Sequence, residues 1–377
     1  MVNDPTGDWQ ERLARKARLR ASAGLRRELR PRGTRDGMVD LAGNDYLGLS
    51  RHPAVLAAAT TALAQYGLGA TGSRLVRGST DVHAALESGL AGLLGTGAAL
   101  VYSSGYLANL GAVRALVQPN TLLLSDAFNH ASLIDGCRSS GAEIAVYPHG
   151  SVPAVEAALA ARGDRPALVV TESVFSVDGD LVRLPELHAV CRRYGALLLV
   201  DDAHAVGVRG PGGAVAEAGL SGEPDVVVTA TLSKSFGAAG GVIAGPRALV
   251  AHLVDTGRTF IYDTALPPPV AAGALAALDL IRAGDDLRAE VRERAALIAK
   301  RLPTVCEPDA GVVSVRAPGP QEAVAWADAC RVRGVAVGCF RPPSTPDSGS
   351  RLRLTVNVGV PRADFEAALD TIAECGP

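Results

Sequence analysis

Apolar positions in the middle of the chain form short continuous runs, with little alternation between apolar and polar residues. Seven runs are expected to be buried strands, at 99–102, 121–124, 143–147, 167–171, 196–200, 226–229 and 241–244. Strands that are apolar on both faces are typical of a parallel sheet covered by helices on both sides. Helices fit between them at 106–116, 131–139, 153–162 and 184–194. The pattern predicts an α/β, doubly wound, mainly parallel sheet, whose ligands bind at the carboxyl ends of the strands.

The pattern changes after the three prolines at 267–269. Long helices are expected at 270–281 and 287–302, and two more helices alternate with short strands at 312–315, 335–337 and 351–356. This mixture predicts a smaller α+β C-terminal domain over 267–377. A large α/β domain would then cover 45–266, preceded by an N-terminal helical segment over 1–44.

The segment 9–35 is rich in arginine, with Leu13, Ala17 and Leu25 interleaved. Its first part is expected to be a surface helix. The arginines are either a solvated helix face or a docking surface for an anionic substrate such as the phosphates of coenzyme A.

Composition narrows the class of protein. The chain is 48% hydrophobic and 20% charged, which allows a sizeable core, and its formal net charge of -2 argues against a nucleic-acid binder. No apolar run approaches the ~18 residues of a membrane span, and the first residues do not resemble a signal peptide. Six cysteines without a CxxC pair fit a reducing compartment, so a cytoplasmic protein without membrane contact is expected.

One lysine, Lys234, lies between two of the apolar runs. It sits in a loop of small residues between the strands at 226–229 and 241–244, with Phe236 as the only bulky neighbour. Such a lysine can be an amine held in a pocket and available for Schiff-base chemistry with a carbonyl. It can equally be a loop lysine that points into water, since buried lysines without a partner are rare.

Other polar residues follow the ends of neighbouring strands. Asp201 comes directly after the strand at 196–200 and either points into the ligand crevice or caps the next element. Ser176 follows 167–171 and is either a hydrogen-bond donor or a turn residue. His130 opens a helix and is either structural or able to stack on a flat ring. The small-residue turn at 103–106 leads into a helix N-terminus, which favours an anion.

Together these residues supply what pyridoxal 5'-phosphate (PLP) needs. A lysine can form a Schiff base with the cofactor, and a buried acid can keep its pyridine nitrogen protonated. A histidine can stack on the ring, and the helix N-terminus can bind the phosphate. The sequence therefore predicts a PLP site with no metal.

The chain resembles the α-oxoamine synthases of PLP fold type I over essentially its whole length. The matching motifs lie at 44–50 (NDYLGLS), 103–106 (SSGY), 130–133 (HASL), 174–179 (VFSVDG), 200–204 (VDDAH), 231–237 (TLSKSFG), 341–343 (RPP) and 351–355 (RLRLT). They occur in the family's order, which makes the resemblance specific for the family and less specific for the substrate.

The resemblance implies a role for each matching residue. Lys234 would be the Schiff-base lysine and the catalytic base, Asp201 would pair with the pyridine nitrogen, and His130 would stack on the ring. The other cofactor-binding residues would be Ser104, Gly105, Tyr106, Ser176, His204 and Thr231. Arg353 would bind the amino-acid carboxylate, with Asn44 and Arg26 near the substrate. Spacing alone does not choose between Arg351 and Arg353, because both lie on one face of a strand. Family members are homodimers with the site at the subunit interface.

The resemblance also implies an activity. Members of the biotin-pathway branch condense L-alanine with pimeloyl-CoA, or with a pimeloyl-carrier protein, and lose CO2. The run RPPSTP at 341–346 favours this branch. The loop at 71–78 also looks like that of the ligase joining glycine to acetyl-CoA, Ala205 replaces a frequent glycine, and 356–360 lacks a histidine found in many relatives. That glycine-dependent ligase, 5-aminolevulinate synthase and a non-catalytic partner subunit are therefore alternatives.

A third class of function is suggested by the spacing of Gly67, Gly69 and Gly72. This GxGxxG pattern occurs in NAD-binding dehydrogenases. It does not follow a strand that turns into a helix within a βαβ unit, so the pattern does not support this alternative.

Overall fold

A computed structural model describes residues 5–34, 36–345 and 347–377 of the chain. Arg35, at the end of the arginine-rich segment, and Pro346, in the RPPSTP run, lie outside the described residues, as do residues 1–4 of the predicted N-terminal segment.

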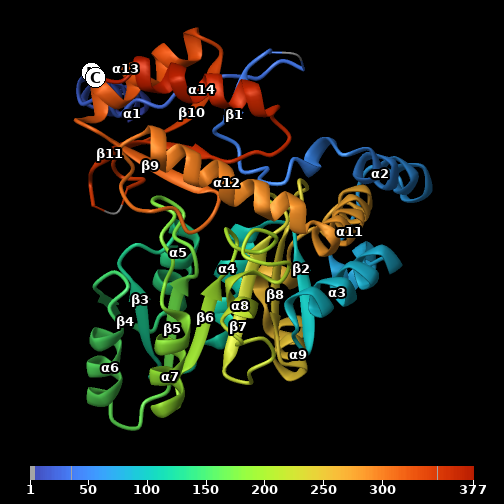
Figure 1. The fold of residues 1–377 in the computed structure, drawn as a ribbon. Coiled ribbons are helices and arrows are strands. Elements are labelled where there is room, and N and C mark those ends of the chain that lie inside the picture. Colours follow the sequence, from blue (N-terminus) through green and yellow to red (C-terminus); the bar gives the residue numbers. More distant parts are fainter. Residues whose placement is uncertain (1–4, 35, 346) are drawn as a thin grey trace.

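The larger sheet has the strand order β2-β8-β7-β6-β5-β3-β4 (Figure 1). Its strands are β2 (Ala98–Tyr102), β3 (Leu122–Asp126), β4 (Glu143–Tyr147), β5 (Ala167–Glu172), β6 (Leu197–Asp201), β7 (Val226–Thr231) and β8 (Gly241–Gly245). Only β8 is reversed among them, since it pairs antiparallel with both β7 and β2. The mainly parallel α/β sheet is thus confirmed, and the reversed strand was not predicted.

Alternate residues of each strand pack into two separate apolar layers. On β5, Leu168 and Val170 belong to one layer and Val169 to the other. The first layer lies under α4 (Gly105–Leu116), α5 (Ala131–Ser140), α9 (Arg247–Thr256) and α10 (Arg258–Ile261). The second lies under α3 (Asp81–Leu94), α6 (Val152–Ala161), α7 (Leu184–Arg193) and α8 (Gly213–Glu217). Burial on both faces explains why the strands are continuously apolar.

A second sheet has the order β1-β10-β11-β9 and lies beyond one end of the first (Figure 1). Its strands are β1 (Val39–Leu41), β9 (Val312–Ala317), β10 (Val335–Phe340) and β11 (Ser350–Thr355), and its helices are α12 (Asp285–Arg301), α13 (Pro320–Val332) and α14 (Arg362–Glu374). β1 pairs parallel with β10, so part of the predicted N-terminal segment completes the C-terminal sheet.

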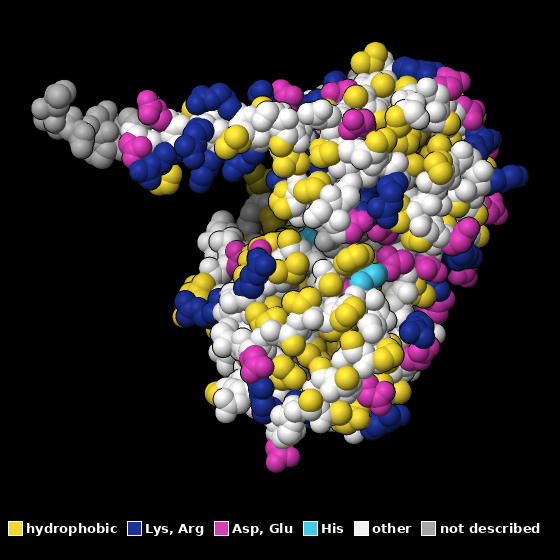
Figure 2. Space-filling view, turned by 90° about the vertical axis from the view of Figure 1, so that its left-hand side faces the viewer, with side chains coloured by type: hydrophobic (Ala, Val, Ile, Leu, Met, Phe, Trp, Pro, Cys, Tyr) yellow, Lys and Arg dark blue, Asp and Glu magenta, His cyan; other side chains and the backbone are white. Residues whose placement is uncertain are grey.

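Three helices from distant parts of the sequence pack side by side at the β2 edge of the large sheet. They are α2 (Pro53–Tyr66), α3 and α11 (Pro268–Ala283) (Figure 1). The first helix, α1 (Pro5–Ser22), projects from the body with Lys and Arg side chains along it (Figure 2). Short turns of helix at Leu49–Arg51 and Arg74–Gly78 complete the elements. Within the described ranges, no helix is both long enough and apolar enough to cross a membrane.

A histidine bridge holds the loop after β5 against β3. His149 Nδ1 lies 2.9 Å from Asp126 Oδ1, and its Nε2 lies 2.8 Å from Asp180 Oδ2, while Phe128 stacks on the ring. Partial burial opposes the charged form, but the hydrogen bonds to the two carboxylates outweigh burial and raise the pKa of His149 to about 9.

We expect this bridge to make stability depend on pH. The folded-state pKa exceeds the unfolded value of ~6.5, so the contribution is complete below pH ~6.5 and is lost as pH rises through about 9. His149→Gln should lower the melting temperature by a few degrees at pH 6.5 and by less at pH 10. Equal decreases at both pH values, measured by circular dichroism, would contradict a charged bridge.

Candidate active site

Lys234 lies in the tight connection between β7 and the reversed strand β8. The Gly237 amide donates to the Lys234 carbonyl at 2.8 Å, and Leu232 and Gly240 close the loop with a further hydrogen bond. Gly237 has φ +61°, and a Cβ there would lie 2.2 Å from the Ser50 amide nitrogen. Only glycine fits this conformation and this close approach, so the loop is pressed against the 49–51 turn and the lysine is held at the carboxyl end of the sheet.

The amine of Lys234 has an unusual environment. Its Nζ lies 2.8 Å from His204 Nε2, and the side chain is half-buried. Enclosure by the surrounding protein lowers the pKa of Lys234 to about 8, with Asp201 opposing and Arg353 reinforcing the decrease. Burial also holds the pKa of His204 well below its ordinary value. The neutral, nucleophilic form of the amine is therefore more accessible at Lys234 than in an ordinary lysine.

A chain of hydrogen bonds leads from Lys234 to a second cation. His204 Nδ1 lies 2.6 Å from the Tyr46 hydroxyl, which donates to Asn44 Oδ1 at 3.3 Å. Arg353 Nη2 donates to the same Asn44 oxygen at 3.0 Å. Burial raises the pKa of Tyr46 to about 12, so its hydroxyl stays protonated. Tyr46 was not among the predicted site residues, although it lies inside the NDYLGLS motif that carried Asn44.

The structure distinguishes the two arginines of β11. Arg351 is bound to the carboxylates of Asp178 and Asp347, so its charge is neutralised. Arg353 is 4% exposed and donates only to neutral oxygens, Ser176 O at 2.6 Å and Asn44 Oδ1. Among the described residues it forms no ion pair with a carboxylate. A buried guanidinium without a counter-ion is costly unless an anionic ligand supplies one.

Asp201 and His130 are connected through a buried amide. Asn109 Nδ2 donates to Asp201 Oδ2 at 2.6 Å and to Ser132 Oγ at 2.9 Å, and Ser132 Oγ lies 2.7 Å from His130 Nδ1. Thr229 donates to Asn109 Oδ1 at 2.5 Å. Asn109 gave no signal in the sequence because a single polar residue within a helix is ordinarily solvated.

A second buried acid, Glu172, supports the loop that carries Ser176. Its Oε2 accepts from the Ser176 amide at 3.0 Å, while its Oε1 is buried without a hydrogen-bond partner. Burial, followed by repulsion from Asp201, raises the pKa of Glu172 to about 8. Ser176 thus contacts both Glu172 and Arg353 through its main chain.

The residues of the predicted anion site lie at the N-terminus of α4. Ser104 caps the helix by accepting from the Leu107 amide at 3.2 Å. A Cβ on Gly241 would lie 2.4 Å from the Ser104 carbonyl oxygen, so β8 approaches this turn closely only as glycine. Thr231 lies beside Gly105, and the Tyr106 side chain is exposed and donates to Asp135. The free amides of the first helical turn remain available to an anion.

Arg26 lies apart from the hydrogen-bonded cluster around Lys234. Arg26 is exposed to solvent, and its main-chain carbonyl accepts a hydrogen bond from Arg341 at 3.2 Å. Within the part of the chain that the structure describes, no hydrogen bond links the Arg26 side chain to the Lys234 cluster. The neighbouring Arg27 donates to Ser344 at 2.7 Å, so the segment is bound to the loop that follows β10.

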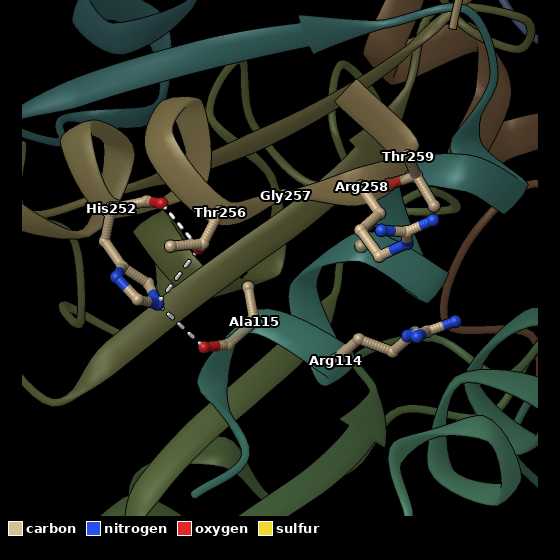
Figure 3. Close-up of a pocket in the computed structure, with 8 residues that line it drawn as sticks. Arg114, Ala115, His252, Thr256, Gly257, Arg258 and Thr259 are labelled. Atoms are coloured by element: carbon tan, nitrogen blue, oxygen red, sulfur yellow. Dashed lines mark hydrogen bonds between the residues drawn. The ribbon is translucent and has the colours of Figure 1, made fainter. Parts of the chain in front are cut away.

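A separate hollow lies between the end of α4 and the α9–α10 corner (Figure 3). His252 Nε2 lies 3.0 Å from the Ala115 carbonyl there, and the lining includes Arg114 and Arg258. None of the predicted catalytic side chains lines it. Across the described ranges, no group of three or more His, Cys, Asp or Glu side chains could hold a metal ion.

Comparison with known proteins gives a consistent result. The family model for aminotransferase class I and II matches residues 36–372. The 8-amino-7-oxononanoate synthase of Mycolicibacterium smegmatis is 53% identical over 352 residues, which are 93% of this chain and 92% of that protein. The chain belongs to the 8-amino-7-oxononanoate synthases within that larger family. Family membership confirms the predicted resemblance and makes the protein a PLP-dependent acyltransferase of biotin biosynthesis.

Solved structures of family relatives have the same fold. Serine palmitoyltransferase from S. paucimobilis with a bound PLP–myriocin adduct superposes with a TM-score of 0.91 at 28% identity, over 99% of this chain and 98% of that one. The 8-amino-7-oxononanoate synthase from Francisella tularensis gives 0.77 at 27% identity, over 90% and 98%. The predicted fold type I architecture is therefore confirmed.

The residues on this chain fit the cofactor. Lys234 offers an amine with a lowered pKa, the α4 N-terminus offers amides to a phosphate, and Glu172 Oε1 is a buried polar atom without a partner at the same end of the sheet. An orphaned buried oxygen is rare in native proteins and indicates a ligand or water at the site.

Proposed function

We propose that this site condenses L-alanine with a pimeloyl thioester, releasing CO2, with PLP held by Lys234. One observation supports the proposal most directly. A chain of hydrogen bonds connects Lys234, whose amine has a lowered pKa, with Arg353, a buried guanidinium that has no carboxylate partner among the described residues. The amine suits a carbonyl, and the guanidinium suits the carboxylate of an amino acid. When bound, the cofactor serves as an electron sink for charge developing at the amino-acid α-carbon.

Each predicted residue has a role in this proposal. Asp201 pairs with the pyridine nitrogen, and His130 covers the ring. Ser176 and His204 lie beside the ring oxygen, and the phosphate is bound by Ser104, Gly105, Tyr106 and Thr231. Lys234 moves the proton at the α-carbon as general base, a duty supported by its lowered pKa and its contact with His204.

Arg353 and Asn44 are proposed to bind the alanine carboxylate. Arg353→Gln should raise the KM for L-alanine about 10- to 100-fold, because a hydrogen bond to a charged group contributes roughly 1.5–3 kcal/mol. Arg316→Gln is the matched control, since Arg316 is an exposed arginine of the neighbouring strand. Steady-state kinetics with varied alanine would measure the change, and an unaltered KM in Arg353→Gln would remove this assignment.

Arg26 is proposed to contact the acyl substrate from the segment bound to the loop that follows β10. The donor is either pimeloyl-CoA or a pimeloyl-carrier protein, and the arginines of this segment and of α1 suit the phosphates of either.

The protein is also proposed to be a cytoplasmic homodimer with interfacial sites. Apolar residues are exposed on α1, and a second copy of the chain would cover them in a dimer. The six free thiols fit a reducing compartment. The apolar residues are Trp9, Leu13 and Leu19.

Product identification tests the proposal. The PLP-loaded protein is incubated with alanine and either pimeloyl-CoA or pimeloyl-carrier protein, and the product mass is determined. A parallel arm contains glycine and acetyl-CoA, the substrates of the alternative ligase. We expect 8-amino-7-oxononanoate from at least one pimeloyl donor and little product from the parallel arm. A product formed only in the glycine arm would overturn the substrate assignment.

A further inference from the structure

Two buried acidic residues lie at the ends of neighbouring strands at the site. Glu172 ends β5 and Asp201 ends β6, and the two residues are direct partners in the parallel register. Their exposed fractions are 2% and 7%. Two carboxylates in such an enclosed place cannot both ionise readily, because each negative charge disfavours the other. A charge on one residue therefore disfavours a charge on the other, and the hydrogen bonds around each carboxyl determine which charge is better stabilised.

The hydrogen bonds of the two carboxyls are unequal. Asp201 accepts the Asn109 amide group at 2.6 Å and the Ala203 amide at 3.0 Å, one on each oxygen. Glu172 accepts the Ser176 amide at 3.0 Å, and the His130 main chain also favours its charged form, but its Oε1 has no hydrogen-bond partner. Hydrogen bonds donated to a carboxylate stabilise its charged form. The third nearby acid, Asp202, is directed elsewhere, toward Ser173 at 2.5 Å and the start of α8.

The orientation of the Asn109 amide is fixed by its other neighbours. Thr229 Oγ1 donates to Asn109 Oδ1, which turns the NH2 group toward Asp201 and Ser132. Both amide hydrogens are then used. His130 Nδ1 accepts from the Ser132 main-chain amide at 3.3 Å, so it carries no proton in neutral His130, and the Ser132 hydroxyl donates to the same atom. The network thus has one consistent direction of donors.

We propose that Asn109 is a positioning residue that assigns the shared negative charge to Asp201 and leaves Glu172 protonated. This inference rests on the proposed pairing of Asp201 with the PLP pyridine nitrogen. A charge located on Asp201 keeps that nitrogen protonated, whereas a charge located on Glu172 would lie on the neighbouring strand. Asn109 touches neither substrate nor reacting atom in this assignment and acts through Asp201.

The test uses full-length protein reconstituted with PLP labelled with ¹⁵N in the pyridine ring. The ¹⁵N chemical shift reports the protonation of the ring nitrogen directly. Asn109→Leu removes the donor with little change in volume, and Ser132→Ala removes only the branch to His130. We expect protonated pyridine in the wild type and in Ser132→Ala, and a shift toward unprotonated pyridine in Asn109→Leu. Product formation in Asn109→Leu should fall about 10- to 100-fold.

The outcomes separate this inference from the proposed function. A protonated pyridine in Asn109→Leu, as in the wild type, would overturn the role of Asn109 alone. An unprotonated pyridine in the wild type would overturn the Asp201 pairing itself. If Asn109→Leu does not fold, judged by circular dichroism, Asn109→Ala removes the same donor without adding apolar volume, and the same two readings apply to it.

Discussion

Replacement of Lys234 by alanine is expected to abolish product formation and covalent retention of the cofactor. Loss of a positioned base alone lowers rates by about 10²–10⁴-fold. The chain contains three lysines, Lys16, Lys234 and Lys300, which makes the covalent test simple. Borohydride reduction of the PLP-loaded protein, followed by peptide mass spectrometry, should place the cofactor on Lys234 only.

Lys300→Ala is the matched control for this experiment, because Lys300 is exposed on α12. It should retain both wild-type activity and the label. Label on Lys300 or Lys16 in the wild type, or turnover by Lys234→Ala at the control's rate, would contradict the assignment. The pKa of about 8 adds a pH signature: capture of PLP by the cofactor-free protein should accelerate as pH rises through about 8, since the neutral amine is the reactive form.

Asp201→Asn is expected to have the second largest effect. The substitution keeps the shape of the side chain and removes its charge. An adjacent opposite charge shifts a pKa by roughly 1–3 units, and each unit corresponds to a tenfold change in protonation equilibrium. We therefore expect turnover to fall by about 10- to 1000-fold, with Lys234 still able to bind PLP.

Asp202→Asn provides the comparison for Asp201→Asn. Asp202 is adjacent in sequence and fully buried, but its oxygens accept from Ser173 and from the amides of Ala214 and Val215. Its substitution should affect thermal stability more than the cofactor. Absorbance spectra and turnover of the two variants, compared at equal PLP occupancy, would contradict the assignment if Asp202→Asn gave the larger loss of turnover.

Much of the fold could be predicted because burial leaves a direct trace in the sequence. Strands covered on both faces must be apolar throughout, so β5, β6 and β7 were visible as runs of Val and Leu. Polar residues at the ends of those runs, such as Asp201, were visible for the same reason. The direction of β8 was not predictable, because a short apolar strand looks the same in either orientation. The precise domain boundaries stay a prediction.

The remaining parts of the site depend on contacts between distant segments. Arg351 and Arg353 share a face of β11, and only the positions of Asp178 and Asp347 show that one charge is already neutralised. Asn109 and Tyr46 act through hydrogen bonds to residues 92 and 158 positions away. Such partners leave no periodic signal. The roles of the individual site residues stay predictions until the variants are measured.

The pairing of β1 with β10 has a consequence for the order in which parts of the protein fold during synthesis. The contact of Val39 with Val335 and the contact of Asn44 with Arg353 can form only after the later residue of each pair has been synthesised. During synthesis, the segments around Asp201 and Lys234 leave the ribosome long before β10 and β11. Domains generally fold as units as they emerge. The proposed cofactor pocket can therefore form on the nascent chain before Arg353, the arginine proposed to bind the amino-acid carboxylate, has been translated. On that proposal, amino-acid binding becomes possible only in the finished chain.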